Sequence, residues 1–304
     1  MGSEGIKVTG PAFYPRSVRC VVVAPPQIVP LIARNVLTSF VRLLYAPKDP
    51  CYRCMAIKMQ SLIIAKPCSH HSQVNCADCR LSALCLPISL QIDDITRLDD
   101  IVQRGKPLQK ADHIYRAGEA FHAIYAVRSG AVKTLSHTSD GEEQVTGFYL
   151  PGEIIGLEGI ANNVYTNTAI ALETSAVCEI PFSRLEELSI KLPNLQRRFL
   201  QIMSREIAAD QQLIILLGKK TAEERIAALL VSISKRNQGR GLAAGEFHLP
   251  MSRSDIGNYL GLTIETVSRV FSRLHKTGII QLDKKHVVIR DMASLQNATA
   301  SEKF

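Results

Sequence analysis

The cysteines are the residues of this chain best suited to chemistry, and three of them stand close together. Cys76, Cys79 and Cys85 fall in the stretch NCADCRLSALC with the spacing C-x2-C-x5-C. The chain has 8 cysteines, clustered in its first 178 residues rather than spread as in the disulfide framework of a secreted domain. Clustered thiols of this kind indicate a metal or redox centre. They also predict a cytoplasmic protein, in which thiols stay reduced.

Two kinds of metal centre fit a triplet of cysteines. An iron–sulfur cluster takes four thiolates, so three ligands that are close in sequence need a fourth that the fold brings to them. Structural zinc more often uses two paired motifs, and an x5 spacing with a remote cysteine fits zinc less well. The pair Cys51 and Cys54 is only a weak metal signal, and Cys68 is interpreted as a spare thiol.

The residues that follow the triplet predict an antiparallel β-roll or barrel. Between residues 113 and 180, short apolar runs are separated by turn glycines, and Ile124, Ala126 and Arg128 alternate along one run. No helical stretches of ~10–15 residues interleave with these runs, which argues against a parallel sheet with crossover helices. Together with the helices farther along the chain, the roll places the protein in the α+β class.

A long helix is predicted from about Pro193 to Leu217, with apolar residues along two faces. One face suits packing on the roll. The second follows the 3,4 spacing of a coiled-coil seam and predicts a homodimer through Leu200, Met203, Ile207, Asp210, Ile214 and Leu217. Asp210 would meet its own copy across a two-fold axis, and this repulsion makes the expected dimer marginal and adjustable. The alternative is that one chain buries both faces by itself.

The C-terminal part predicts a winged helix-turn-helix. Ser252, with Asp255 three residues on, starts a short helix that stops at Gly261, and Thr263 starts a second helix that runs to about Lys276. The run IIQLDKKHVVIR then forms two strands and a turn, the wing. Arginine can hold guanine with two hydrogen bonds, and glutamate can accept one from cytosine. DNA binding is assigned to the second helix and the two cap residues: Glu265, Ser268, Arg269, Arg273, Thr263 and Ser252.

Charge is divided unevenly along the chain. Residues 59–218 hold 14 Lys/Arg and 18 Asp/Glu, whereas residues 219–290 hold 13 and 6. A basic C-terminal module is expected where one domain meets nucleic acid. No clean run of about 20 apolar residues exists to span a membrane. The predicted domains are an extension upstream of the native start (1–58), the cysteine loop and roll sensor domain (59–192), the dimerisation helix (193–218), the winged helix-turn-helix (219–292) and a tail (293–304).

The order of these parts resembles the CRP/FNR superfamily of bacterial transcription regulators, over about residues 76–290. The strings SDIGNYLGLTIETVSR, LETSAVCEIP and KKTAEER are similar to runs of its FNR branch, the fumarate and nitrate reduction regulator. The resemblance implies that Cys76, Cys79, Cys85 and Cys178 ligate one oxygen-labile [4Fe–4S] cluster. It also implies an activator of anaerobic metabolism genes, a homodimer that binds double-stranded promoter DNA with a TTGAT-type inverted repeat and contacts RNA polymerase.

Other signals and other functions stay open at this point. Cyclic-nucleotide members of the superfamily hold phosphate with an arginine–serine pair, where this chain has Thr166, Asn167 and Thr168. Without that arginine a cyclic phosphate has no counter-charge, so cyclic AMP is not the expected signal. One alternative is a regulator of the same architecture that senses a haem-bound gas, thiol redox or a small ligand. The other is an iron–sulfur enzyme, which is disfavoured because the sequence shows no nucleophile–base pair, phosphate loop or zinc-protease motif.

Overall fold

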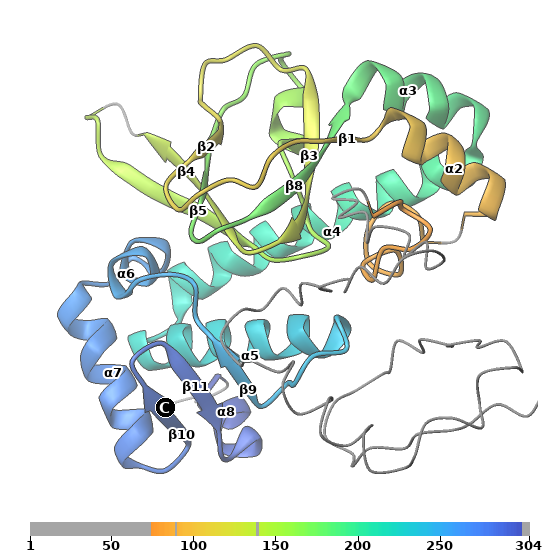
Figure 1. Cartoon of the computed structure of the whole chain (residues 1–304). Coiled ribbons are helices and arrows are strands. Elements are labelled where there is room, and N and C mark those ends of the chain that lie inside the picture. Colours follow the sequence, from red (N-terminus) through yellow and green to blue (C-terminus); the bar gives the residue numbers. More distant parts are fainter. Residues whose placement is uncertain (1–73, 89, 138–139, 300–304) are drawn as a thin grey trace, which may run out of the picture. The chain divides into compact units, whose positions relative to one another are not determined.

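The computed structural model, drawn in Figure 1, describes three stretches of the chain: residues 74–88, 90–137 and 140–299. The described residues belong to one compact unit. The predicted extension 1–58 and the cysteines Cys51, Cys54 and Cys68 lie outside the described residues, so what the sequence predicts for them stays a prediction. Among the helices that the structure describes, none is long and apolar enough to cross a membrane.

Two four-stranded sheets form the β-roll. The first has the order β1 (Gln103–Arg104), β8 (Ala176–Pro181), β3 (Ala123–Ser129) and β6 (Ile154–Ile155). The second has the order β2 (His113–Tyr115), β7 (Thr168–Ala171), β4 (Val132–His137) and β5 (Glu143–Tyr149). Every strand pair in them is antiparallel, which confirms the predicted roll.

Strand β3 is buried on both faces over most of its length. Tyr125 and Val127 belong to the cluster inside the roll. Ile124 and Ala126, which point the other way, belong to a second cluster outside it. A strand covered on both sides shows a continuous apolar run instead of an alternation, so the outer face of the roll needs a covering layer of its own.

Helices supply that layer on the outer face of β3. They are α2 (Ile92–Ile101), α3 (Phe182–Lys191) and the first turns of α4 (Pro193–Lys219). Leu98, Leu185 and Leu195, one from each helix, are at most 1% exposed. Sequence analysis assigned neither α2 nor α3, while α4 agrees with the predicted long helix. A short 3-10 helix, η2 (Leu157–Ile160), follows β6.

The C-terminal module is a winged helix-turn-helix, as predicted. Its helices are α5 (Ala222–Gly239), α6 (Arg253–Leu260), α7 (Ile264–Lys276) and α8 (Met292–Thr299). Its strands, β9 (Glu246–His248), β10 (Ile280–Asp283) and β11 (His286–Ile289), form a sheet of order β10-β11-β9. Glycine is required at position 257 within α6, because a Cβ there would lie 2.6 Å from the carbonyl oxygen of Leu262 in the turn between α6 and α7.

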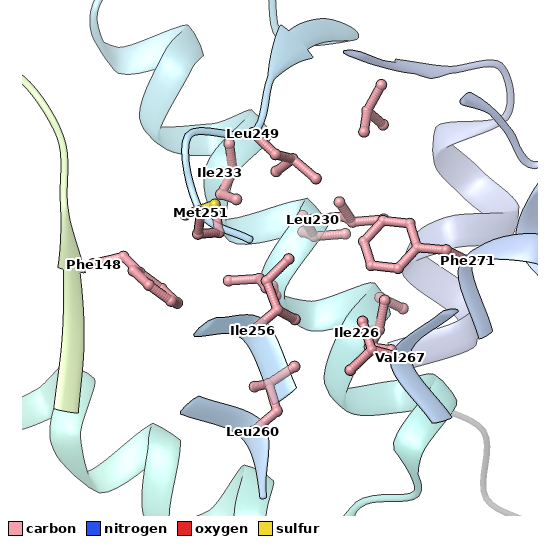
Figure 2. Packing of buried hydrophobic residues seen from close by; sticks show 14 of the residues in the cluster. Phe148, Ile226, Leu230, Ile233, Leu249, Met251, Ile256, Leu260, Val267 and Phe271 are labelled. Atoms are coloured by element: carbon pink, nitrogen blue, oxygen red, sulfur yellow. The ribbon is translucent and has the colours of Figure 1, made fainter. Parts of the chain in front are cut away.

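An apolar core holds the helix pair together, and Figure 2 shows part of it. Ile256 and Leu260 from α6 pack with Val267 and Phe271 from α7, all of them at most 1% exposed. Phe148 from strand β5 of the roll belongs to the same cluster. This core fixes α7 in position and leaves its opposite face to solvent.

Helix α8 corrects one expectation, because residues 293–304 were predicted to be a tail. Residues 292–299 instead form a helix that packs on α5, and Leu295 is 0% exposed in the core of the module. The helix lacks strong periodicity and has a single buried leucine, so its sequence gives little sign of its burial.

Leu295→Ala should therefore destabilise the module by about 2–5 kcal/mol, the usual cost of truncating a buried leucine. Urea unfolding followed by circular dichroism measures this. The matched control is Gln296→Ala on the exposed side of α8, which should change the free energy of unfolding by less than about 0.5 kcal/mol. Equal effects of the two variants would contradict the packing described for α8.

Candidate metal centre and nucleic-acid interface

The three clustered cysteines lie on a loop of successive tight turns. Backbone N–H groups of Ser82 and Cys85 donate to the carbonyls of Cys79 and Leu81, at 3.0 and 2.9 Å. Immediately after the third cysteine, Leu86 is 1% exposed and joins the cluster on the outer face of β3. Burial of one leucine of this kind stabilises the arrangement by roughly 1.5–3 kcal/mol. The loop is thus anchored at its C-terminal end.

Cys178 reaches the same place from the roll. It lies on β8, opposite Ala126 of β3 on one side and opposite Arg104 of β1 on the other. One cavity is lined by all four cysteines predicted as ligands: Cys76, Cys79, Cys85 and Cys178. The fold therefore gathers the triplet and the remote cysteine around one space, although they are 93 or more residues apart in sequence.

The four cysteines are the type of ligand that an iron–sulfur cluster requires. All four cysteines are free thiols, and the rest of the cavity lining is mostly apolar, with Leu81, Leu86 and Val127 among its residues. Four thiols in an apolar pocket match what such clusters require. In the stretches that the structure describes, no three His, Cys, Asp or Glu side chains are already arranged around a metal position. The thiols share the cavity without having ligand geometry in this conformation.

Burial keeps the thiols of Cys76, Cys85 and Cys178 protonated in the absence of metal. It raises the pKa of Cys85 to about 12, and it raises the pKa of Cys178 as well. The pKa of Cys76 is raised by burial and, after that, by Asp99. Metal ligation needs thiolates, so binding must release these protons, and the affinity for metal should fall as the pH falls.

Asp99 and Arg104 are two residues at this site that sequence analysis missed. The backbone N–H of Cys76 donates to Asp99 Oδ1 at 2.7 Å. Arg104 also donates to Asp99 Oδ1 and lies with Nη2 3.5 Å from Cys76 Sγ. Burial acts to raise the pKa of Asp99, but the hydrogen bonds from Cys76 and Arg104 lower it, so the carboxylate is charged. One guanidinium thus lies beside Cys76 and opposite Cys178.

The predicted DNA-binding residues of α7 lie on its exposed face. Glu265, Ser268, Arg269 and Arg273 are all exposed. Arg269 Nη2 donates to the hydroxyl of Thr266 at 3.0 Å. These side chains project from a helix whose other face is buried in the core. They are therefore available to a groove of DNA, which admits one α-helix.

Three more of the residues predicted to contact DNA have partners within the chain. Arg273 forms an ion pair with Glu223 of α5 at 2.8 Å. Ser252 is half-buried, and its hydroxyl accepts from the N–H of Asp255 at 3.0 Å and donates to the same carboxylate at 2.6 Å. Thr263 caps α7 through the N–H of Thr266. The two caps confirm the predicted helix starts, and the roles of these residues in DNA binding stay predictions.

The predicted dimer face of α4 is apolar and exposed. Leu200 and Ile207 are each 57% exposed, and Ile214 is 70% exposed. Met203 and Leu217 are half-buried, and Asp210 is exposed. Large aliphatic side chains repeated at this spacing along one helix face are typical of a surface that another helix covers.

The roll, the long helix and the exposed recognition helix together define a DNA-binding transcription regulator. Residues 106–191 match the cyclic nucleotide-binding domain, and residues 224–298 match the Crp-like helix-turn-helix domain. The solved structure of FixK2 from Bradyrhizobium japonicum is similar, with a TM-score of 0.61 and 34% identity, covering 67% of this chain and 100% of that one.

Two curated relatives show to which group of transcription regulators the chain belongs. Transcriptional activator protein FnrA of Stutzerimonas stutzeri is 55% identical over 223 residues, which are 73% of this chain and 91% of FnrA. The fumarate and nitrate reduction regulatory protein of Yersinia pestis is 44% identical over 230 residues, 76% and 92% of the two chains. The chain belongs to the FNR branch of the CRP/FNR superfamily. It is a transcription regulator and not an enzyme, which removes the iron–sulfur enzyme from the alternatives.

Asp99→Ala should destabilise the metal-free protein by about 1–3 kcal/mol, because Arg104 then loses its carboxylate and the Cys76 N–H its acceptor. Urea unfolding measures this, and hydrogen exchange of the peptide around residues 76–86 should become faster. The control is Asp100→Ala, the next residue of α2, which is exposed. Unchanged exchange in the Asp99 variant would show that the carboxylate does not hold the loop.

Proposed function

We propose that this regulator responds to oxygen through a [4Fe–4S] cluster held by Cys76, Cys79, Cys85 and Cys178. The observation that carries the proposal is the cavity lined by all four thiols, one of which comes from the roll. Relatives named anaerobic regulatory protein, 46% identical over 230 residues in Pasteurella multocida, support the same physiological setting. In this proposal the chain controls genes of anaerobic metabolism.

When bound, the cluster would supply an oxygen-reactive centre between the cysteine loop and strand β8. The chain's own residues determine how binding or loss of the cluster changes the position of the cysteine loop. With the four thiols held together, the loop is tied to Cys178 as well as to the core through Leu86. With the thiols released, the loop is kept in place only by its packing and by hydrogen bonds such as that from the Cys76 N–H to Asp99. The chain with its thiols held by the cluster and the chain with its thiols released are two conformational populations. Oxygen shifts the equilibrium from the first to the second.

The exposed face of α4 supports a homodimer. Leu200, Ile207 and Ile214 would be removed from water by a second copy of the helix. Asp210 lies between Ile207 and Ile214 on this face and would approach its own copy. Like charges at a desolvated contact oppose association, so the dimer needs help from the rest of the chain. We infer that a loop held by the cluster gives this help by setting the position of α4.

The dimer would place two copies of α7 on one face of promoter DNA. Half-sites about one helical turn apart are the spacing that two-fold dimers of this type read. In a TTGAT-type inverted repeat, Arg269 and Glu265 suit the two edges of the G·C pair. Lys276, Lys284 and Lys285 suit phosphates, which position the module without specifying sequence. Once on DNA, the dimer would contact RNA polymerase.

Protein purified without oxygen should be brown and hold about four irons and four sulfides per chain. Admitting air should bleach it and abolish binding to a TTGAT-type palindrome. Cys178→Ser should lose the visible absorption and anaerobic DNA binding, whereas the control Cys68→Ser should behave like the wild type. A colourless protein that binds DNA equally with and without air would sink the proposal and favour a regulator that senses another signal.

Asp210→Ala should bind the palindrome in air, because removal of the facing carboxylates leaves an apolar seam that associates without the cluster. Anisotropy of labelled DNA and sedimentation velocity measure binding and dimerisation together. Gln211→Ala, the exposed neighbour on α4, should stay dependent on anaerobic conditions. Strictly anaerobic binding by the Asp210 variant would refute the assignment of the seam.

A further inference from the structure

Arg198 of helix α4 is a buried arginine that holds the cysteine loop. It is 4% exposed. Its Nε donates to the carbonyl oxygen of Cys85 at 3.1 Å, and its Nη2 donates to the carbonyl oxygen of Leu84. The helix that carries the dimer face is therefore bonded directly to the backbone of the third cysteine, 113 residues away in sequence.

The charge of this arginine is poorly compensated in the absence of metal. Among the ion pairs of the described residues, none joins Arg198 to a carboxylate. Its guanidinium instead donates to the backbone of Cys85, one of the four predicted metal ligands. A buried cation without an anionic partner is costly. A fixed negative charge on Cys85 would remove much of that cost.

The loop residues beside Arg198 pack tightly on the roll. Leu84 lies against Gly152, where an added Cβ would be 3.1 Å from the Cβ of Leu84. Arg198 precedes Leu200, the first residue of the exposed dimer face, by two positions on the same helix. A displacement of the loop therefore reaches the dimer face through one rigid element, without an intervening hinge.

We propose that Arg198 couples metal loading at the cysteine loop to dimerisation along α4. The inference rests on the proposed function, because it needs Cys85 to be a ligand. The two carbonyl hydrogen bonds of the guanidinium are held best when Cys85 is fixed in the metal centre and α4 is seated on the loop. By linkage, each of these two conditions stabilises the other. Arg198 acts through the position of α4 and is a positioning residue.

The test compares Arg198→Gln with Arg197→Gln, the exposed neighbour on the same turn. Sedimentation under anaerobic conditions gives the dimer dissociation constant of each full-length protein, once with the cluster and once after removal of iron by a chelator. The ratio of the two constants is the coupling. We expect Arg198→Gln to reduce this ratio about tenfold, within the range typical of coupled sites, with the visible spectrum of the cluster retained. Arg197→Gln should keep the wild-type ratio.

Arg198→Lys serves as a second variant in case the glutamine variant folds poorly. It keeps the charge but cannot donate to two carbonyls as a planar fork does, so its ratio should fall between the wild type and Arg198→Gln. An equal loss of dimer affinity with and without the cluster would assign Arg198 a merely structural role and overturn the inference alone. A wild-type protein that never takes up iron would overturn the proposed function, and the inference with it.

Discussion

The burial of strand β3 on both faces is the constraint on which the proposed metal centre depends. Its inner residues fill the roll, and its outer residues, Ile124 and Ala126, are apolar and need a cover. Helices α2, α3 and α4 supply most of that cover, and Leu86 at the end of the cysteine loop completes it. Cys178 belongs to the same outer surface. The hydrophobic effect therefore brings the loop to the strand that carries the fourth thiol, before any metal is considered.

The charge of Arg198 acts against this packing when metal is absent, and a bound metal centre would reverse that effect. Two buried or nearly buried guanidinium groups, those of Arg104 and Arg198, flank thiols whose pKa values are raised by burial. Arg104 is already paired with the carboxylate of Asp99, but neutral thiols offer no counter-charge to Arg198. As metal ligands the cysteines would be thiolates, and both cations would then serve as their counter-charges. The apolar contacts fix where the loop lies, and the charges determine which state of the thiols suits that place.

Sequence reasoning succeeded where the signals are local. The helix-turn-helix follows from caps, glycines and apolar spacing within about 30 residues, and the caps at Ser252 and Thr263 hold in the structure. Sequence reasoning failed for the helices whose formation depends on burial against other parts of the fold. Helices α2 and α3 pack on the outer face of the roll, and α8 is held by one buried leucine, Leu295.

The site shows the same division. The type and spacing of the three clustered cysteines are visible in the sequence, so these thiols of the cavity could be predicted. The fourth, Cys178, could be predicted with the help of a family resemblance. Asp99, Arg104 and Arg198 could not. Their roles consist of hydrogen bonds to the backbone or to distant side chains, such as the bond from Arg198 to Cys85 across 113 residues. No spacing rule in one sequence links residues that meet only in the folded chain.

The contacts between the roll and the DNA-binding module limit how a signal can travel. Asp255 caps α6 and also pairs with Lys133 of β4 at 2.7 Å, with both side chains less than 20% exposed. Arg236 of α5 bonds Glu153 in the turn after β5. A carboxylate that serves a helix cap and a partly buried ion pair at once cannot leave one without weakening the other. The recognition helix is thus already fixed to the roll within one chain. What one chain lacks is the second recognition helix, and the pairing of α4 is the step that would supply it.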